Sequence, residues 1–411
     1  MCSPSPANSE CNRPTAFGYY ATRRTGTVQR VRPAVASPYL GSLFILTPVR
    51  GCREVQSTTT GPQVSVVIRL HRREQYIVEA VQSVLDSTIE RTAYEILVVT
   101  DGLSKELRER LRELGVQILE SGTLSSGEML GIGVSSARGE VVAFLDDDDC
   151  FRPEKLATLL QVFSDPRVVY YHHGLQRVDL DRRPVTARAE LAPVYSRFTL
   201  PLSRGDAAWI RRKGGMYNVS SIAVRRSALV PQIAALRPVT NGHDFALLLL
   251  LKGPGDVVID GSRVLVDYRT HVSMGTHDFT GGQVSDVHVR FLEGTVRSFE
   301  WLCRVAPTPG ARSFARCRAE SYETLLATTT GRFVSGNPLR RTLAVRAAIG
   351  NLREGDVRSA AILSFLAFLS LYSRQWAVRF YIPLKRTELA SIGLATAAMP
   401  SGPSTGASGS T

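Results

Sequence analysis

Four consecutive aspartates, Asp146 to Asp149, follow directly on the apolar run Val141–Leu145. An apolar run of this length, preceded by Gly139 and followed by acids, is typical of a buried strand. In an open α/β sheet, ligands bind outside the carboxyl ends of the strands, so the acids stand where a ligand is expected. Adjacent carboxylates repel one another, and they are tolerated when they are solvated or share a cation.

Two interpretations of the acidic run remain open. Hard oxygen ligands at a strand end suit Mg²⁺ or Mn²⁺, and such a metal suits a diphosphate. Alternatively, the acids form a turn that caps the next helix, because Pro153 is a good first-turn residue and acids favour helix N-termini. A cap needs one acid and four are present, which favours the metal and phosphate interpretation.

Apolar runs and helical periodicities alternate through the first half of the chain. Strands are expected at 64–70, 95–99, 116–119, 141–145 and 168–171, and helices at 76–85, 104–114, 127–138 and 156–163. Strands that alternate with helices at this spacing predict an α/β fold with a mostly parallel, doubly wound sheet flanked by helices. Regular patterns then stop at about residue 172, and 172–215 is expected to be a long irregular excursion.

Pattern returns in the second half of the chain. Strands are expected at 220–224, 257–259 and 264–266, a helix at 244–251, and only helices from 286 to 395. The uncharged run 359–373 is too short to span a bilayer. Its spacing places Ile362, Phe365, Leu366 and Leu369 on one face, and the helix belongs either to a core or to a membrane interface.

The net charge of +13 is distributed unevenly along the chain. Residues 1–60 and 290–411 are basic, whereas 61–289 is close to neutral. Basic flanks suit an anionic membrane surface or nucleic acid, and they also favour solubility. The flanks lack interleaved aromatic residues, so a nucleic-acid partner is disfavoured. The six cysteines form no CxxC pair, which argues against a zinc site and a disulfide framework.

Both ends of the chain differ in composition from the middle. Residues 1–60 are rich in Ser, Pro, Arg and Gly and are expected to be a disordered extension, and 396–411 a flexible tail. The extension shows no secretory signal, which favours a cytoplasmic location, with the inner face of the membrane as an option. An organellar transit peptide and a start codon assigned too early are alternatives for the same segment.

Several segments together resemble the family 2 glycosyltransferases of GT-A fold. They are Val64-Ser65-Val66-Val67-Ile68, the helical pattern up to Thr88, Tyr94-Glu95-Ile96-Leu97-Val98-Val99, Arg138-Gly139-Glu140, and Phe144-Leu145-Asp146-Asp147-Asp148-Asp149. The resemblance implies a GT-A domain over 61–285 and a transferase that moves a sugar from a nucleotide diphosphate sugar to a hydroxyl acceptor, with inversion at the anomeric carbon.

The resemblance also implies roles for the acids and their neighbours. The family's metal-binding Asp-x-Asp corresponds to Asp146 and Asp148, with Mg²⁺ or Mn²⁺ as the cation and Asp148 as the stronger ligand. Asp147 or Asp149 would reach the ribose or the donor sugar. The segment Tyr268-Arg269-Thr270-His271 resembles the family's Tyr-Arg-x-His, so that His271 would complete the metal coordination or touch the diphosphate; His277 is a weaker candidate.

A further set of residues is implied around the nucleotide and the acceptor. Arg69, Glu74 and Asp101 would bind the nucleotide sugar. Asp244, in Gly242-His243-Asp244-Phe245, corresponds to the family's general base and would deprotonate the acceptor hydroxyl. The alternative for Asp244 is a helix cap.

The sequence departs from the family pattern in three places. His243 stands where the family has Glu. The first strand ends in Arg69-Leu70-His71-Arg72 in place of Pro-Thr-Tyr-Asn, and the second in Thr100-Asp101-Gly102-Leu103 in place of Asp-Asp-Gly-Ser. The last two changes fall on the nucleotide pocket, so the sequence does not identify the nucleotide.

The leading functional hypothesis is a metal-dependent inverting glycosyltransferase that acts on a cell-envelope glycan or glycolipid. The acceptor site would be formed by 172–215 and the helical C-terminal region, with a peripheral membrane contact for a lipid-linked acceptor. A non-catalytic nucleotide-sugar-binding protein of the same fold is the alternative. A nucleotidyltransferase is disfavoured, because the segment after the first strand has Arg72 and Arg73 but no glycines.

Overall fold

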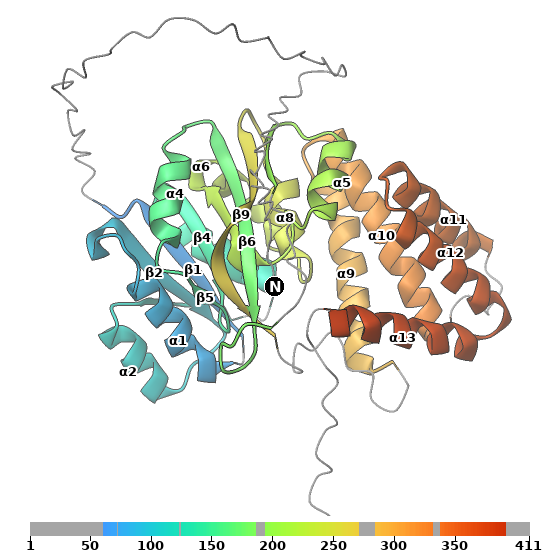
Figure 1. Cartoon of the computed structure of the whole chain (residues 1–411), viewed down its shortest axis with the longest axis horizontal. Coiled ribbons are helices and arrows are strands. Elements are labelled where there is room, and N and C mark those ends of the chain that lie inside the picture. The colour runs from blue at the N-terminus through green and yellow to red at the C-terminus, as the bar shows by residue number, and fades with distance from the viewer. Residues whose placement is uncertain are drawn as a thin grey trace, which may run out of the picture. The chain divides into compact units, whose positions relative to one another are not determined.

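The computed structural model describes residues 61–71, 73–122, 125–185, 194–270, 284–331 and 338–391. The predicted extension 1–60 and the tail 396–411 lie outside these residues. The described strands form one nine-stranded sheet in the order β3-β2-β1-β4-β8-β6-β9-β5, with β7 paired to β9 (Figure 1).

The first four strands of the sheet are parallel, as the sequence predicted. They are β1 (Val64–Leu70), β2 (Tyr94–Thr100), β3 (Gln117–Glu120) and β4 (Val141–Asp146). The helices between and after them are α1 (Glu74–Leu85), α2 (Lys105–Glu113), α3 (Ser126–Ser136) and α4 (Lys155–Phe163), with the 3₁₀ turn η1 (Arg91–Ala93) before β2. Because these strands run parallel, the ends of β1, β2 and β4 meet at one edge of the sheet, where the four aspartates begin.

The segment predicted to be irregular, 172–215, contains regular structure. β6 (Val168–Val178) runs seven residues further than the predicted strand, and β7 (Tyr195–Thr199) and α5 (Arg204–Arg212) follow, while 186–193 lies outside the described residues. The prediction was wrong because β6 buries polar residues such as His172 and His173, which conceal its apolar pattern. The buried face of α5 consists of Ala207, Ala208 and Ile210 among charged neighbours.

The rest of the sheet has mixed strand directions. β8 (Ile222–Arg225) lies antiparallel between β4 and β6, and β9 (Asp256–Arg269) is a single strand where two were predicted. β9 also pairs with β5 (Cys150–Phe151), the short strand that directly follows the acidic run. The connecting elements are η2 (Val219–Ser221), α6 (Arg226–Leu229), η3 (Val230–Gln232), α7 (Ile233–Leu236) and α8 (His243–Leu249).

The two faces of the sheet are covered by two apolar cores. One core contains side chains of α1, α2 and α4, and the other contains side chains of α3, α5, α8, α9 and α10. Successive strand residues point to opposite faces, so that Val67 belongs to one core while Val66 and Ile68 belong to the other. Burial on both faces explains why the strands read as continuous apolar runs.

From residue 286 onward the described residues form only helices, as predicted. They are α9 (Asp286–Val305), α10 (Pro309–Thr330), α11 (Pro338–Arg353), α12 (Val357–Tyr372) and α13 (Arg374–Ser391). Thr308 caps α10, with Pro309 in its first turn, and Gly331 ends it in the left-handed conformation. Ion pairs link these helices to α5, from Arg204 to Glu354 at 3.2 Å and from Arg211 to Asp356.

The apolar run 359–373 forms most of α12, and one detail of its prediction was wrong. Leu366 is buried, but the side chain of Phe365 is 45% exposed instead of sharing the buried face. A helix that is apolar on almost every side gives no polar stripe from which its orientation can be read. No helix in the described part of the chain is long and apolar enough to cross a bilayer.

Candidate functional site

The first acid of the run, Asp146, ends β4 and pairs with an arginine on the neighbouring strand. Arg69 Nη2 lies 2.6 Å from Asp146 Oδ1, and the same guanidinium donates to the Ser126 hydroxyl at the start of α3. The Asp146 amide donates to the Ser220 hydroxyl at 3.0 Å. The register of the parallel strands places Arg69 directly opposite Asp146.

The next two acids share a second arginine. Arg73 Nε lies 3.2 Å from Asp147 Oδ1, and its Nη1 pairs with Asp148. The His71 amide donates to Asp147 Oδ2 at 2.8 Å. The segment that follows β1 therefore wraps over the acids and supplies a positive charge to them.

The last acid, Asp149, is fully buried and held by β9. Its Oδ1 accepts a hydrogen bond from the Arg269 amide at 2.9 Å, and its Oδ2 has no hydrogen-bond partner within the described residues. The Arg269 guanidinium donates to the Asp148 carbonyl at 2.9 Å, to the Leu180 carbonyl at 2.7 Å and to Glu79 Oε2 at 2.5 Å. Arg269 on β9 thus fixes the backbone of the acidic turn.

Burial and these arginines give the acids different pKa values. Burial raises the pKa of Asp146, and the Arg69 guanidinium more than offsets it, so that this pKa lies below its ordinary value. Burial raises the pKa of Asp147 to about 7, against the opposing charge of Arg73. Burial, followed by the charges of Asp148 and Asp146, holds the pKa of Asp149 well above its ordinary value. The run is therefore not a solvated cluster of four equal charges, because two arginines pair with three of the acids and burial disfavours the charged forms of Asp147 and Asp149.

Asp244 lies in the first turn of α8, and its charge interacts with those of Asp146 and Arg69. Gly242, with a φ of +71°, turns the chain into the helix without a side-chain cap, and the Phe245 amide donates to Asp244 Oδ1 at 3.0 Å. Burial raises the pKa of Asp244 to about 7, with Asp146 raising it further and Arg69 lowering it. The Asp244 carboxyl therefore lies within electrostatic reach of the acidic turn.

His243 occupies the position at which the resemblance led us to expect an acid. Burial lowers the pKa of His243 to about 3, and its Nδ1 has no hydrogen-bond partner in the described part of the chain. The imidazole is therefore neutral at physiological pH. This position does not supply the carboxylate that the resemblance implied beside Asp244.

Two residues expected at the nucleotide lie at the ends of β1 and β2. Asp101 is exposed directly after β2. Glu74, in the first turn of α1, accepts hydrogen bonds from the Ser104 amide at 3.1 Å and the Ser104 hydroxyl at 3.0 Å, so it holds the start of α2. His271 and His277 lie outside the described residues.

The acidic turn provides the type of ligand that a hard divalent cation requires. Within the described residues no three His, Cys, Asp or Glu side chains are grouped to hold a metal ion by themselves. Mg²⁺ in nucleotide enzymes is commonly held by one or two carboxylates together with substrate phosphates, not by a complete protein cage. The carboxylates of Asp146 and Asp148 fit that arrangement, with Arg73 as the positive charge that now pairs with Asp148.

Comparisons with a family model and with known proteins both find glycosyltransferases. The family described as glycosyl transferase family 2 matches residues 65–229, which include β1 to β8 and the acidic turn. Over residues 65–229, the chain is therefore similar to the family 2 glycosyltransferases. An uncharacterized glycosyltransferase of Nostoc sp. is 29% identical over 176 residues, which is 41% of this chain and 52% of that protein. One from Haemophilus influenzae is 28% identical over 114 residues, 27% of this chain and 38% of that protein. The chain thus covers about half the length of the Nostoc protein and a smaller share of the Haemophilus protein.

Solved structures with a similar arrangement include glycosyltransferases. Residues 1–349 of S. aureus TarS in complex with UDP-GlcNAc align with a TM-score of 0.49 and 13% identity, over 79% of this chain and 92% of that one. The mannosyltransferase PcManGT of Pyrobaculum calidifontis, in complex with GDP-Man and Mn²⁺, aligns with a TM-score of 0.43 and 16% identity, over 81% and 86%. The family match and the sheet order confirm the predicted GT-A type of fold for the glycosyltransferase domain.

Sequence reasoning missed several residues that shape the site of the glycosyltransferase domain. Arg73 was noted only for the absence of glycines around it, and Arg269 only as part of a motif that pointed to His271. Ser220 and Lys155 had no signal. The Lys155 ammonium group is fully buried, donates to the Ser220 carbonyl at 2.6 Å and lies 3.5 Å from the centre of the Phe151 ring. Burial holds its pKa well below the ordinary value, against the charge of Asp149.

Proposed function

We propose that this protein transfers a sugar, with inversion, from a nucleotide diphosphate sugar to a hydroxyl group of an acceptor. The observation that supports this most is the position of Asp244, a carboxyl with a pKa of about 7 within electrostatic reach of Asp146 and Arg69. A general base works best when its pKa lies near the pH at which the enzyme operates. Asp244 would take the proton of the acceptor hydroxyl as that oxygen attacks the anomeric carbon of the donor.

The donor would be held at the acidic turn. Asp146 and Asp148 would bind a divalent cation, Mg²⁺ or Mn²⁺, with His271 as a further ligand. Such a cation, when bound, neutralises the charge that develops on a departing diphosphate. Asp147 or Asp149 would bind the ribose or the donor sugar.

The remaining contacts to the nucleotide would come from the ends of β1 and β2. Asp101 is exposed there and free to meet a base or a ribose, and Arg69 lies between the turn and α3. Glu74 would act with them, and its contacts with Ser104 would join donor binding to the start of α2. These assignments extend the family resemblance to individual residues.

Thermal unfolding of the full chain with UDP, GDP, dTDP and CMP, each with and without Mn²⁺, tests this function. A ligand that binds the native state alone raises the stability. We expect one nucleoside diphosphate to raise the Tm in the presence of Mn²⁺, and Asp148→Asn to remove most of that rise. A chain for which no nucleotide produces a metal-dependent rise would contradict the donor assignment.

Arg73 gives a sharper test of the metal site. Because its guanidinium pairs with Asp148, it must withdraw before a cation binds there. Removal of a unit charge a few ångströms away changes the electrostatic energy by more than about 1.4 kcal/mol, which is about tenfold in affinity. Arg73→Gln should therefore bind Mn²⁺ alone about tenfold more tightly than the parent chain, as measured by calorimetry. Arg73→Lys keeps the charge and should remain close to the parent; equal affinities for all three chains would contradict the metal assignment.

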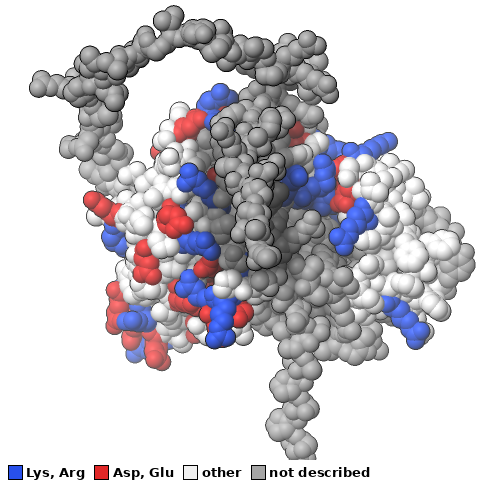
Figure 2. Space-filling view, viewed as in Figure 1, with Lys and Arg blue, Asp and Glu red and all other residues white. Residues whose placement is uncertain are grey.

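We further propose that the acceptor is a cell-envelope glycan or glycolipid reached at a membrane face. An exposed apolar patch lies on α12 and α13, and its members are Phe365, Phe368, Trp376, Phe380 and Leu384. The rings of Phe365 and Phe380 are 5.4 Å apart, so exposed apolar side chains of the two helices meet there. In Figure 2 the described surface at the right edge is mostly uncharged, with Lys and Arg side chains along its inner side. Exposed aromatic clusters of this kind mark partner or membrane surfaces.

Sedimentation with vesicles of phosphatidylglycerol and phosphatidylcholine tests the membrane contact. The chain should sediment with these vesicles, and Phe368→Ser with Trp376→Ser should reduce the bound fraction several-fold, because two aromatic anchors of about 2 kcal/mol each are lost. Val230→Ser, which removes an exposed apolar side chain elsewhere, is the control. Equal sedimentation of all variants would count against the patch.

A non-catalytic nucleotide-sugar-binding protein is the second candidate. The neutral His243 beside Asp244 and the arginines that pair with the acidic turn are the observations that favour it. Binding of a nucleotide without any release of free nucleoside diphosphate from the cognate nucleotide sugar, across a panel of acceptors, would favour this candidate over the transferase.

A further inference from the structure

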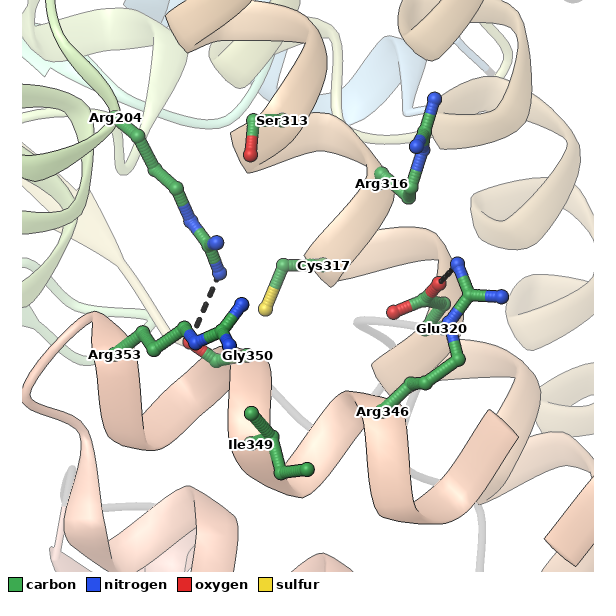
Figure 3. A pocket seen from close by; sticks show the side chains of 9 residues that line it. All are labelled: Arg204, Ser313, Arg316, Cys317, Glu320, Arg346, Ile349, Gly350 and Arg353. Carbon is green, nitrogen blue, oxygen red and sulfur yellow. Dashed lines mark hydrogen bonds and ion pairs between the residues drawn. The ribbon is translucent and has the colours of Figure 1, made fainter. Parts of the chain in front are cut away.

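A hollow of about 330 Å³ lies where α5 meets α10 and α11 (Figure 3). Arg204 extends into it from α5, Arg316 belongs to α10, and Arg346 and Arg353 belong to α11. These four arginines come from three helices that are separated in the sequence. None of the residues that line the hollow is among those proposed for the donor, the cation or the general base, although they belong to the regions that the sequence assigned to the acceptor site.

The charges around the hollow do not balance. Glu320 is the one carboxylate among its lining residues, and its Oε1 already pairs with Arg346 Nη2 at 2.5 Å. Arg204 donates to the Gly350 carbonyl at 3.0 Å and pairs at 3.2 Å with the buried Glu354. Glu354 also pairs with Arg318 at 2.8 Å, so its charge is divided between two arginines. Within the described residues, a positive excess therefore remains in the hollow.

Two of the four guanidinium groups carry most of this excess. Arg316 and Arg353 have exposed side chains, and neither makes a hydrogen bond or an ion pair with the described residues. A basic residue in the last turn of a helix is stabilised by the helix dipole, which accounts for Arg353 alone. That explanation does not apply to Arg316, which lies in the middle of α10.

Small groups form the floor of the hollow. A Cβ atom at Gly350 would come within 2.7 Å of the Cys317 sulfur and 3.4 Å of Arg204 Nη2, so only glycine allows α11 to approach α10 this closely. In Figure 3 the head groups of Arg204 and Arg353 lie beside Cys317, Arg346 turns toward Glu320, and Arg316 extends away from Cys317 at the rim of the hollow. The result is a concave site with a small uncharged base, two guanidinium groups beside that base and two further arginines at its rim.

We propose that this hollow binds a phosphate group of a soluble or lipid-borne ligand. Guanidinium groups bind phosphate oxygens through paired, charge-assisted hydrogen bonds. The volume is at the lower end of the range for small-molecule sites, which suits a phosphate or diphosphate with part of its substituent. An anion in the hollow would also relieve the repulsion between arginines that have no acid to share.

Calorimetric titration of the full, metal-free chain with inorganic phosphate and pyrophosphate tests the site. Arg316→Gln combined with Arg353→Gln should weaken pyrophosphate binding by at least about tenfold, since two charged contacts are lost. Arg297→Gln combined with Arg358→Gln is the matched control, because both residues are exposed arginines of the helical region and the net charge falls equally. The control should bind as the parent does.

The same variants give an independent reading without any anion. If the arginines repel one another in the empty hollow, the Arg316→Gln and Arg353→Gln double variant should have a Tm equal to or above that of the parent chain. Pyrophosphate binding that is unchanged in this variant, or that falls equally in the control, overturns the proposal. Unchanged binding in this variant would place the anion outside the hollow.

Vesicles distinguish the two sources of the phosphate. Pyrophosphate should compete with phosphatidylglycerol vesicles for the parent chain if a lipid head group is the natural occupant. Pyrophosphate binding that is unaffected by the vesicles, yet still lost in the Arg316→Gln and Arg353→Gln variant, supports a soluble phosphate ligand. Neither result depends on sugar transfer, so the inference stands or falls separately from the proposed function.

Discussion

Replacing Asp244 with asparagine should lower the rate of sugar transfer by about 10²- to 10⁴-fold, the range that a general base contributes. Binding of the donor nucleotide should be unchanged, because the Asp244 side chain is not among the groups that would hold it. The measurement is kcat with the nucleotide sugar identified by thermal unfolding, together with the Kd of the nucleotide. A variant that keeps the parent rate would remove Asp244 from the mechanism.

The pH dependence follows from the same carboxyl. Asp244 must be ionised to accept a proton, and burial raises its pKa to about 7. The value of kcat/KM should therefore fall as the pH decreases through about 7 and level off above it. The pKa of Asp147 also lies at about 7, so Asp147→Asn is the discriminating variant: it should retain this profile if Asp244 is the group that titrates.

A helix cap is the competing explanation for Asp244, and α9 offers a matched control. Asp286 is likewise an acid in the first turn of a helix. Asp286→Asn should change the rate of transfer little, whereas both substitutions should cost a similar, small amount of stability if each acid only favours its helix N-terminus. A large loss of rate in both variants would indicate an indirect effect through the fold.

Replacing Arg269 with methionine should lower the free energy of unfolding by about 3 kcal/mol, because the buried guanidinium donates three hydrogen bonds that methionine cannot replace, at about 1 kcal/mol each. The side chain is 3% exposed and lies 4.6 Å from the centre of the Tyr76 ring, in addition to its contacts with the Asp148 carbonyl, the Leu180 carbonyl and Glu79. Methionine keeps much of the apolar stem and removes all of the guanidinium donors. Urea denaturation with a structural probe gives the difference.

A surface ion pair provides the comparison for Arg269. Arg108 pairs with Glu120 at 2.5 Å, with side chains that are 28% and 51% exposed. Arg108→Met should cost less than about 1 kcal/mol. If Arg269→Met proved no more costly than Arg108→Met, the acidic turn would not depend on β9 for its shape. Because Arg269 fixes the turn, its variant should also lose the metal-dependent response to nucleotide.

The sequence predicts the first half of the fold well for a physical reason. Strands buried on both faces of a parallel sheet must be apolar along their whole length, so β1, β2 and β4 stand out without other information. β7 and α5 do not stand out, because β7 alternates exposed and partly exposed residues and α5 buries mainly alanine. Polar burial in β6 hides the end of that strand in the same way.

The candidate site shows a similar division between what is local in the sequence and what is not. The position of Asp146–Asp149 at a strand end follows from the chain itself. The partners of these acids do not, because Arg73 and Arg269 are separated from them by more than 70 residues. The burial of Asp149, which raises its pKa, depends on β9 and therefore cannot be inferred before the sheet is assembled.

The position of Arg69 opposite Asp146 has a consequence for how the sheet aligns itself. β1 and β4 are otherwise apolar along their paired residues except for Ser65, and apolar contacts alone distinguish poorly between one alignment and the next. A shift by one residue would set the Asp146 carboxylate beside Ile68 or Leu70, and the Arg69 guanidinium would lose its acid. The charged pair therefore penalises misaligned strands during folding, so that the residues proposed for donor binding also select the one strand pairing that assembles the site.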